Sequence, residues 1–432
     1  MKGWRPSTWG DEISLEYGKG LRGYESACGP VQVFGSNGPV GWTDKALAKG
    51  PGVILGRKGA YRGVQYSESD FFVIDTAYYV APKTDLDMRW LYYAVKYHKL
   101  GEIDDGSPIP STTRAAVYVR ELDVPPKGVQ KEIARVLGSI DDKIHLDRGI
   151  NQTIEAMAQA IFKSWFVDFD PVKAKIAAKQ EGRDPLRAAM CVISGKPDAD
   201  LDALPQEQLN QLAATAALFP DEMEESELGE IPRGWIPKTL LAVCELNASS
   251  WSAKTLPVSV RYVDLANTKN GEIIEVQTVE GSNIPSRARR ILVTGDTIVG
   301  TVRPGNRSFA LVGEAGLTGS TGFAALHPRM NFLREYVYLA ATSDANIERL
   351  AHLADGGAYP AVRPELVVSD TLPIPPEELL REFHRISFHM FEKILANKRA
   401  SRDLAELRDT LISKLVPGEL AVTAPVEAVG DA

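Results

Sequence analysis

The residues best suited to hold a charged partner lie in a glycine-rich loop near the N-terminus. The stretch LGRKGAYRG spans residues 55–63 and carries four side chains of interest: Arg57, Lys58, Tyr61 and Arg62. Glycine lets a backbone approach a partner closely, and basic side chains suit phosphates and guanine edges. The loop therefore predicts a contact with nucleic acid.

Further loops of this kind occur elsewhere in the chain. The polar turn FGSNGPVGW holds Asn37, and asparagine can read adenine. The strings TVRPGNRS and SRARR in the C-terminal half add four candidates: Arg287, Arg303, Asn306 and Arg307. Taken singly, each loop is more often a solvated turn than a DNA contact. Two related basic loops in two halves of one chain favour nucleic acid.

No arrangement of residues typical of an enzyme is found. The chain lacks the GxxxxGK[ST] phosphate loop, the HExxH zinc motif and the GxSxG motif. The string DFDP (168–171) differs from the Asp/Asn-Pro-Pro-aromatic signature of amino-methyltransferases. The six histidines show no metal-ligand spacing. We therefore expect no catalytic residue, no metal site and no cofactor.

The elements that must position these loops are repeated. The string LDVPPKGVQKEIARVLGSIDDKI (122–144) has a counterpart in LPIPPEELLREFHRISFHMFEKI (372–394). Residues 111–166 align with 361–416 at a constant offset of 250 without a gap. Two unrelated amphipathic helices would share neither the paired prolines nor this offset. The chain therefore contains an internal duplication.

Each copy predicts one long helix that starts directly after its proline pair. Proline is tolerated there because the first N–H of a helix has no partner within the helix. The helices are expected at 127–166 and 377–416, each roughly 60 Å long. Apolar residues seven apart predict a coiled-coil seam between them.

Polar residues interrupt each predicted seam midway. They are Asp147 and Asn151 in the first helix, and Asn397 and Ser401 in the second. A buried polar layer lowers stability but can fix the register of a helix pair. If the helices run antiparallel, these four residues face one another.

The segments before the two helices are related more weakly. Residues 51–82 and 294–328 both lead from an apolar strand, through a glycine-bounded basic loop, to further strand-like runs. The pair Gly3-Trp4 recurs as Gly234-Trp235. The expected fold is therefore α+β, with two globular α/β units separated by two long antiparallel helices in a coiled coil. The duplication predicts a pseudo-two-fold arrangement.

The net charge of −8 looks unsuited to DNA, but it is concentrated in one segment. Residues 181–230 hold 12 acidic and 3 basic side chains, and the rest of the chain holds 46 basic and 45 acidic. The near-neutral remainder does not exclude a basic face. The acidic segment is typical of a solvated connector, in which DALPQEQLNQLAATAALF (202–219) could form a short helix.

Hydropathy and cysteine usage predict the compartment. No apolar run reaches the ~18 residues of a membrane span, and the N-terminus lacks the apolar region of a signal peptide. The three cysteines are isolated from one another, which favours reduced thiols in a cytoplasm over disulfides or a zinc site.

Several of these strings resemble the specificity (S) subunit of type I restriction–modification systems, the HsdS family. The similar segments are LGRKGAYRG…FFVIDTAYYV, the run from DVPPKGVQKEIARVLGSIDDKI to INQTIEAMAQAIFKSWFVDFDP, ELGEIPRGW, and LPIPPEELLREF…LRDTLISKLVPGEL. They span nearly the whole chain, and the proline pair followed by a helix ending in IFKSWFVDF is quite specific. The globular halves match loosely.

The resemblance implies a layout of parts along the chain. These would be a target-recognition domain at 1–125, a conserved helix at 126–168, an acidic linker at 169–230, a second target-recognition domain at 231–375, a second conserved helix at 376–418 and a disordered tail at 419–432.

The resemblance also implies a function. The two domains would read a two-part, asymmetric sequence in double-stranded DNA, and the helices would space them and dock two methyltransferase subunits. Restriction subunits would join the complex. S-adenosylmethionine and ATP would be handled by these partners, so the chain itself would be non-catalytic.

Two other functions stay open from the residues alone. One is a coiled-coil scaffold whose globular units bind peptides and not DNA. The other is an enzyme, such as a nuclease or a methyltransferase fused to its own reader, against which the missing motifs argue.

Overall fold

The computed structural model describes residues 3–104, 106, 110–354 and 360–422. Residues 423–432, most of the expected disordered tail, lie outside this description. The chain divides into two compact units: residues 1–148 with 398–432 form unit 1, and residues 149–397 form unit 2.

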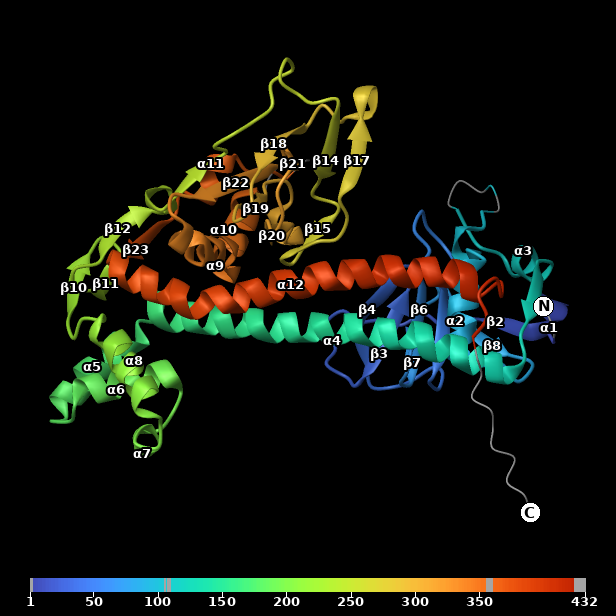
Figure 1. Ribbon diagram of the computed structural model, residues 1–432, viewed down its shortest axis with the longest axis horizontal. Helices are drawn as coiled ribbons and strands as arrows, with labels where there is room; N and C mark the ends of the chain where they lie inside the picture. The colour runs from blue at the N-terminus through green and yellow to red at the C-terminus, as the bar shows by residue number, and fades with distance from the viewer. Residues whose placement is uncertain (1–2, 105, 107–109, 355–359, 423–432) are drawn as a thin grey trace. The chain divides into compact units, whose positions relative to one another are not determined.

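The two longest elements are α4 (Lys127–Phe166) and α12 (Glu377–Leu415), and each contributes one half to each unit (Figure 1). The first helix has the predicted bounds and the second ends one residue before its predicted end. Both start as the proline pairs require, because Val129 N donates to Pro126 O over 2.9 Å and Leu379 N donates to Pro376 O over 3.1 Å.

Two of the sheets described in unit 1 have more than two strands. The larger has the strand order β2-β8-β5-β6, and the smaller has the order β4-β3-β7, with β3 and β7 parallel. Strands β1 and β9 pair separately, next to the start of α4. The elements are β1 (Arg5–Thr8), α1 (Trp9–Glu12), β2 (Ile13–Tyr17), β3 (Val31–Gly35), β4 (Gly38–Thr43), β5 (Gly52–Gly56), β6 (Val64–Ser67), β7 (Phe71–Val73), β8 (Ala77–Pro82), α2 (Met88–Tyr97), η1 (Leu100–Glu102), α3 (Arg114–Tyr118) and β9 (Glu121–Val124).

Unit 2 repeats this arrangement with additions. Its order β13-β22-β19-β20 matches the larger sheet, and β17-β14-β21-β18 matches the smaller one with a strand added. Strands β14 and β21 are parallel, like β3 and β7. The elements are β12 (Ile236–Thr239), η2 (Leu240–Ala242), β13 (Cys244–Leu246), β14 (Ser259–Val263), β15 (Thr268–Lys269), β16 (Glu272–Ile273), β17 (Gln277–Glu280), η3 (Gly281–Asn283), β18 (Ala288–Leu292), β19 (Thr297–Gly300), η4 (Pro304–Asn306), β20 (Phe309–Leu311), β21 (Leu317–Ser320), β22 (Phe323–Pro328), η5 (Asn331–Leu333), α9 (Arg334–Thr342), α10 (Asp344–Ala354), α11 (Pro364–Val367) and β23 (Thr371–Ile374).

The matched strand order in both units confirms the duplicated α+β fold. Strand β12 pairs with β23 just as β1 pairs with β9, and in both cases the second strand leads into a long helix. In each unit the halves of α4 and α12 run antiparallel. None of the described helices is long and apolar enough to cross a membrane.

The segment between α4 and the second set of strands is folded. It contains α5 (Asp170–Gln180), α6 (Pro185–Ser194), α7 (Asp198–Leu201), α8 (Gln206–Ala217) and the hairpin β10 (Met223–Ser226) to β11 (Gly229–Pro232). Helices α6, α7 and α8 share a small core of Ala189, Met190, Leu201 and Ala216. From the sequence we expected one short helix here, within residues 202–219. The high acidity of the segment obscured an apolar pattern that is sufficient for a small helical core.

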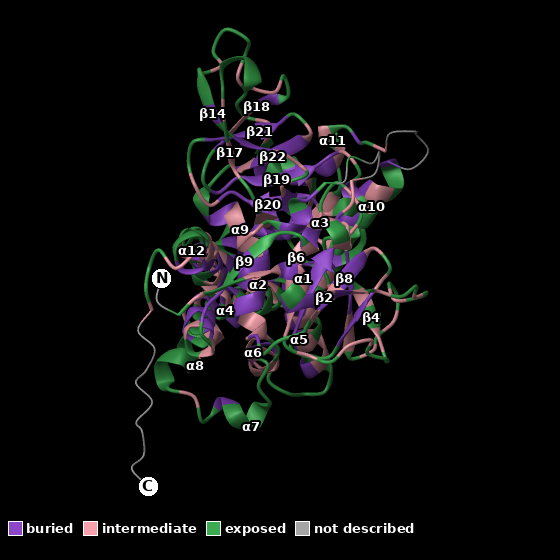
Figure 2. Ribbon diagram, turned by 90° about the vertical axis from the view of Figure 1, so that its right-hand side faces the viewer, coloured by how far each residue is buried: buried purple, intermediate pink, exposed green. Residues whose placement is uncertain are grey.

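The long helices bury one line of residues more deeply than the other. On α4, Leu137, Ile144, Ala158 and Trp165 are at most 3% exposed, whereas Ile154 and Ile161 are only half-buried. In Figure 2 the strands β19 and β22 are largely buried, whereas α7 is largely exposed. On α4 the seam therefore lies mainly along the line of Leu137, Ile144, Ala158 and Trp165.

The string IFKSWFVDF forms an aromatic cluster in unit 2. Phe162, Trp165 and Phe166 at the end of α4 pack against Phe383 of α12. The rings of Phe166 and Phe383 lie edge to face with centroids 5.0 Å apart, a favoured aromatic geometry. This cluster explains why the string is so rich in aromatic residues.

Candidate nucleic-acid interface

The glycine-rich loop of unit 1 joins β5 to β6. Gly56 N donates to Gly63 O over 2.8 Å and closes the loop, and Ser36 Oγ donates to Lys58 O over 2.6 Å. A Cβ on Gly56 would lie 2.1 Å from Ser36 O, so only glycine fits there. The loop and the turn between β3 and β4 therefore form one surface.

Three of the predicted contact residues are exposed on this surface. Asn37 is on the turn and lies next to Gly63 of the loop: a Cβ added to Gly63 would be 3.1 Å from Asn37 Oδ1. Lys58 and Tyr61 are on the loop, and Tyr61 is 78% exposed. Within the described residues, the side chains of Lys58 and Tyr61 form no hydrogen bond or ion pair, so both are free to meet a partner.

Arg62 is used differently. Its guanidinium donates to Gly59 O over 2.6 Å, to Gly101 O over 2.8 Å and to Ile103 O over 3.1 Å. Each of its three nitrogens thus contacts a backbone carbonyl. Arg62 therefore fastens the loop to η1 and the residue after it.

Arg57 belongs to a cation–π stack that sequence patterns did not reveal. Its guanidinium donates to Asp75 O over 2.9 Å and lies 4.9 Å from the ring centre of Tyr17. Arg114, at the start of α3, lies 4.2 Å from the same ring, and its Nε is buried without a hydrogen-bond partner among the described residues. Since Tyr17 and Arg114 are far apart in sequence, no local motif marks them.

The loop between β19 and β20 in unit 2 occupies the equivalent position. Gly300 N donates to Ser308 O over 2.7 Å, as Gly56 N does to Gly63 O. Arg303 N donates to Pro360 O over 2.8 Å, as Gly59 N does to Pro110 O over 3.0 Å. These matched hydrogen bonds align the two loops despite their different sequences.

The loop of unit 2 holds two arginines with left-handed backbone. Arg303 has φ 47° and Arg307 has φ 59°, and they bracket the turn η4. Such strain in residues other than glycine clusters at functional sites. Arg303 and Asn306 are exposed, whereas Arg307 is bonded to Asp344 over 2.6 Å.

Arg287 lies on the other sheet of unit 2. Its Nε donates to Tyr262 OH over 3.1 Å, and its Nη2 lies 3.6 Å from Asp264 Oδ2. It precedes β18 and is not part of the loop that carries Arg303. The structure thus brings Arg303, Asn306 and Arg307 together, and leaves Arg287 on a different element.

The polar residues of the helix pair occupy buried positions. In unit 2, Asn397 Nδ2 donates to Asn151 Oδ1 over 2.9 Å. In unit 1, Arg408 forms an ion pair with Asp141 over 2.7 Å. In the antiparallel register that this pair sets, Ser401 lies within about one residue of the position opposite Asp147. Asp147 Oδ2 and Ser401 Oγ are both buried without a hydrogen-bond partner in the described part of the chain.

The ionisable side chains of the described residues can be compared with the geometry of a metal site. Among the described residues, no group of His, Cys, Asp and Glu side chains is arranged to hold a metal ion. The pair His384–Glu335 joins α12 to α9 over 2.6 Å within unit 2 and has a structural role. The exposed loops are thus the features that suit a binding function.

Comparisons with known proteins agree with this geometry. Residues 28–156 match the family described as type I restriction modification DNA specificity domain. The chain is 30% identical over 415 residues to the type I restriction enzyme HindI specificity subunit of Haemophilus influenzae, covering 88% of each protein. It is 23% identical over 437 residues to the MjaIX specificity subunit of Methanocaldococcus jannaschii, covering 96% of this chain and 88% of that protein.

A solved structure shares the fold. The S subunit of a type I restriction–modification system from M. genitalium matches with a TM-score of 0.50 and 16% identity, over 98% of this chain and 97% of that one. The identity and coverage of the Haemophilus relative establish the family. The chain therefore belongs to the DNA specificity subunits of type I restriction–modification systems, which bind DNA, assemble with the other subunits and leave catalysis to them.

Proposed function

We propose that each unit reads one half of a two-part, asymmetric sequence in double-stranded DNA. Unit 1 would read through Asn37, Lys58 and Tyr61, and unit 2 through Arg303 and Asn306. The observation that carries the proposal is that the β5–β6 loop and the β19–β20 loop have matching backbone hydrogen bonds but different exposed side chains. Because both copies belong to one chain, the loops can diverge and the target need not be palindromic.

The exposed side chains suit distinct roles. Lys58 and Arg303 supply charges for phosphates or guanine edges, and the amides of Asn37 and Asn306 suit adenine. Arg57 stacks on Tyr17 and uses one nitrogen for Asp75 O, which leaves guanidinium donors for a DNA phosphate. Arg114 stacks on the same ring with its Nη2 3.7 Å from Glu16 Oε2, so we assign it to holding Tyr17 in place. Arg62, Arg287 and Arg307 are held by the fold, so we assign them to positioning the reading surfaces.

The helix pair offers two equivalent docking surfaces for methyltransferase subunits. On α4, Met157 is 50% exposed between the half-buried Ile154 and Ile161. On α12, Leu407 is 49% exposed between the half-buried Leu404 and Leu411. These three residues follow their counterparts on α4 by 250 positions.

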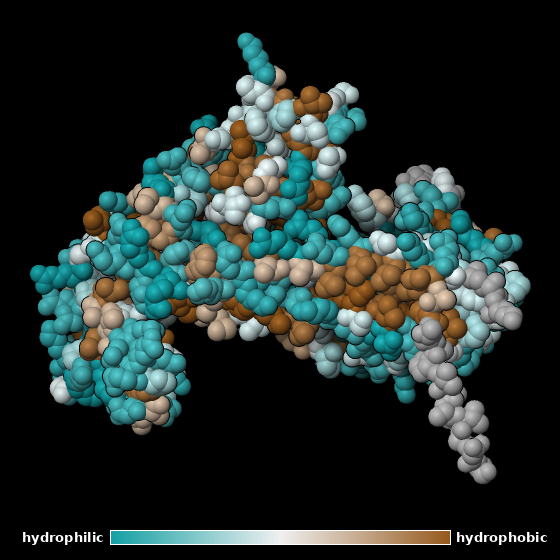
Figure 3. Space-filling view, in the orientation of Figure 1, coloured by the Kyte–Doolittle hydropathy of each residue, from teal (hydrophilic) through white to brown (hydrophobic). Residues whose placement is uncertain are grey.

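Figure 3 shows hydrophobic surface over the second half of α12. Because the apolar stripe occurs once in each unit, it supports two methyltransferase copies, and restriction subunits would join this complex. The three cysteines are free, which fits a cytoplasmic complex.

Binding to half-replaced targets tests the proposed reading. The target is first located by mapping methylated sites in the source cell, and duplexes are made with either half replaced. The change Lys58→Ala with Tyr61→Ala is expected to cost about 1–3 kcal/mol on the half read by unit 1. The change Arg303→Ala with Asn306→Ala should do the same on the other half.

Matched controls separate reading from folding. Lys45→Ala removes an exposed charge of unit 1 outside the loop and should leave affinity unchanged. Arg62→Ala should lower the thermal stability of unit 1 because three carbonyl contacts are lost. If both loop variants weakened both halves equally, or left affinity and its salt dependence unchanged, the assignment of one half to each unit would be wrong.

A further inference from the structure

The outer edge of strand β20 in unit 2 is covered by the chain itself. Asn270 N donates to Arg307 O over 2.8 Å, and Gly271 N donates to Phe309 O over 2.9 Å. Both donors lie at the tip of the β15–β16 hairpin. That tip rests on Tyr338, whose hydroxyl donates to Glu155 over 2.7 Å. The edge strand is therefore closed by a peptide backbone laid along it.

The counterpart of β20 in unit 1 is β6, and its outer edge is open. Strand β20 is the last strand of its sheet, next to β19, and β6 is the last strand of its sheet, next to β5. Gly56 and Gly63 form a hydrogen-bonded pair, and such pairs alternate along antiparallel strands. Gln65 and Ser67 therefore direct their backbone N–H and C=O groups toward β5, whereas Val64 and Tyr66 direct theirs outward. Within the described residues, these outward groups have no hydrogen-bond partner.

The difference arises from one connection. In unit 2 the β15–β16 hairpin lies between β14 and β17, whereas in unit 1 the corresponding strands β3 and β4 are joined by the turn Ser36-Asn37. That turn reaches Gly63, whose N–H donates to Ser36 O over 2.8 Å, and goes no further along β6. A short turn therefore replaces the segment that covers the edge in unit 2.

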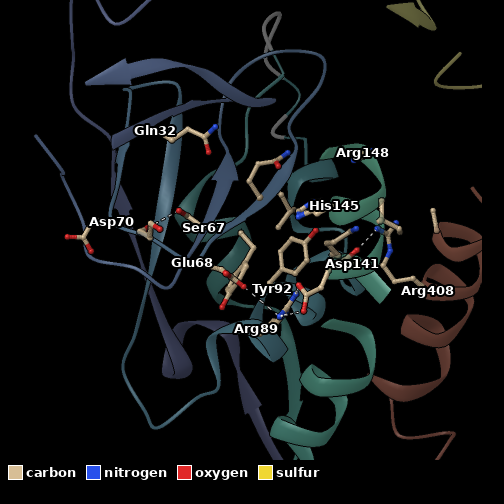
Figure 4. A pocket seen from close by; sticks show the side chains of 18 of the residues that line it. Gln32, Ser67, Glu68, Asp70, Arg89, Tyr92, Asp141, His145, Arg148 and Arg408 are labelled. Carbon is tan, nitrogen blue, oxygen red and sulfur yellow. Dashed lines mark hydrogen bonds and ion pairs between the residues drawn. The ribbon is translucent and has the colours of Figure 1, made fainter. Parts of the chain in front are cut away.

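The uncovered edge lines a cavity of about 600 Å³ within unit 1. In Figure 4 its walls come from the strands, from α2 and from the unit 1 parts of α4 and α12. Trp42, Tyr66 and Tyr92 contribute aromatic surface, and Trp42 is 45% exposed. The cavity thus follows β6 along its length, since all four residues of the strand line it, and it has aromatic side chains beside the edge.

The cavity is lined by four carboxylates and four cations, so the charges that lack an ion pair distinguish possible occupants. Each lining carboxylate already has a partner: Glu68 and Asp142 contact Arg89, Asp141 contacts Arg408, and Asp70 accepts from Gly50 N.

Two lining cations, Lys96 and Arg148, form no ion pair among the described residues, and the ammonium of Lys96 lies 5.3 Å from the ring centre of Tyr92. Burial, and then the nearby positive charge of Arg408, lowers the pKa of Lys96. Lys96 and Arg148 are therefore the lining cations that acidic side chains of an occupant could meet.

We propose that β6 accepts an extended acidic peptide segment of a partner subunit, which adds to the outer edge of the strand as the β15–β16 tip does in unit 2. A peptide is favoured over DNA because Val64 and Tyr66 present alternating backbone donors and acceptors, which pair with another backbone. An open edge is also a liability that proteins usually cover. The inference rests on the proposed function, because the partner is a subunit of the same complex.

Hydrogen exchange in the complex assembled from the full chain and purified methyltransferase subunits tests the inference. The amides of Val64 and Tyr66 are expected to exchange about tenfold more slowly in the complex than in the free chain. A benzoylphenylalanine photo-cross-linker in place of Tyr66 should link to one acidic, extended segment of the partner. A link only to a basic or helical segment would overturn the proposal.

Two variants probe the edge and the charge separately. Tyr66→Pro removes an outward N–H while leaving the pairing of β6 with β5 intact, since proline is tolerated on the free side of an edge strand. Tyr66→Pro and Lys96→Glu should each weaken assembly about tenfold. The matched control Lys45→Glu places the same charge change outside the cavity and should have no effect. If circular dichroism shows that a variant is unfolded, the exchange measurement on the unaltered chain decides.

Several outcomes would overturn the inference. Unchanged exchange of β6 in a complex that does form would refute it while the proposed function stands. Failure of the complex to form would refute the inference together with the proposed docking surfaces on the helices, and would leave the proposed DNA reading to its own test. Slow exchange of the Val64 and Tyr66 amides in the free chain would also refute the inference. If that protection rises with protein concentration, a second copy of the chain covers the edge. If it vanishes on truncation after residue 422, the chain's own C-terminal segment covers it. Slower exchange of these amides on addition of DNA alone, without the partner subunits, would also refute the inference.

Discussion

Asn397 donates a hydrogen bond from its Nδ2 to Asn151 Oδ1 over 2.9 Å, between two antiparallel helices of unit 2. Both residues are buried, and Asn151 Nδ2 also reaches Ile394 O at 3.4 Å. Two amides in an apolar seam are satisfied only when they stand opposite each other. The pair therefore fixes the register of α4 against α12.

We expect Asn397→Leu alone to lower the free energy of unfolding by about 1–3 kcal/mol, because it leaves the buried amide of Asn151 without its partner. The double change Asn151→Leu with Asn397→Leu should recover most of this loss, since an apolar pair needs no hydrogen bond. Chemical denaturation of the three variants measures the coupling. Strictly additive losses would show that the two amides do not act as a pair.

The apolar stripes on the helices predict the number of methyltransferase subunits in the complex. Met157→Glu should remove one copy and Leu407→Glu the other, because each places a charge on one of two equivalent apolar surfaces. Native mass spectrometry of the reconstituted complex counts the copies. Val119→Glu, at an exposed valine of unit 1 away from the stripes, is the control and should leave the count unchanged. Loss of both copies from one single variant would argue against two separate surfaces.

The left-handed backbone of Arg303 predicts a conflict between stability and binding. Arg303→Gly should raise the free energy of unfolding by up to ~1 kcal/mol, because glycine adopts φ 47° without strain while gaining entropy in the unfolded chain. The same change should weaken DNA binding.

Thermal unfolding and a DNA titration measure the two effects of Arg303→Gly. Arg307→Gly is the comparison, since it relieves similar strain but also loses the ion pair with Asp344. A destabilised Arg303→Gly variant would show that the arginine side chain itself supports the loop.

The buried carboxylate of Glu12 predicts acid sensitivity of unit 1. Burial raises its pKa, but hydrogen bonds from Arg5, Ser7 and Thr84 outweigh this and the pKa lies below the ordinary value of 4.5. A lowered folded-state pKa means that this stability is fully present above the unfolded-state pKa and is lost as the pH falls through the folded-state one.

Unfolding measured from about pH 3 to about pH 7 tests the role of Glu12, because Glu12→Gln should be less stable at neutral pH and flatten the acid-side slope. An identical slope in both proteins would exclude Glu12 as its source. Asp11→Asn, at the exposed neighbouring carboxylate, is the matched control.

Much of the architecture could be predicted because its causes are local. The proline pairs mark where α4 and α12 begin, since proline fits only the first turn of a helix. The constant offset of 250 revealed the duplication, and the interruptions at Asn151 and Asn397 predicted which residues would meet. Exposure of Lys58, Tyr61 and Arg303 also followed from their place between glycines or beside proline in short loops.

Tertiary structure alone decided what each of these residues does. Arg62 looks like Arg57 and Lys58 in sequence, yet its guanidinium is used by carbonyls of a segment some 40 residues away. The stack of Arg114 on Tyr17 and the open edge of β6 arise from strands and turns that are distant along the chain. Periodicity and proline act within a few residues and can be read from sequence, whereas the partners of a side chain or a strand edge depend on how separate segments pack.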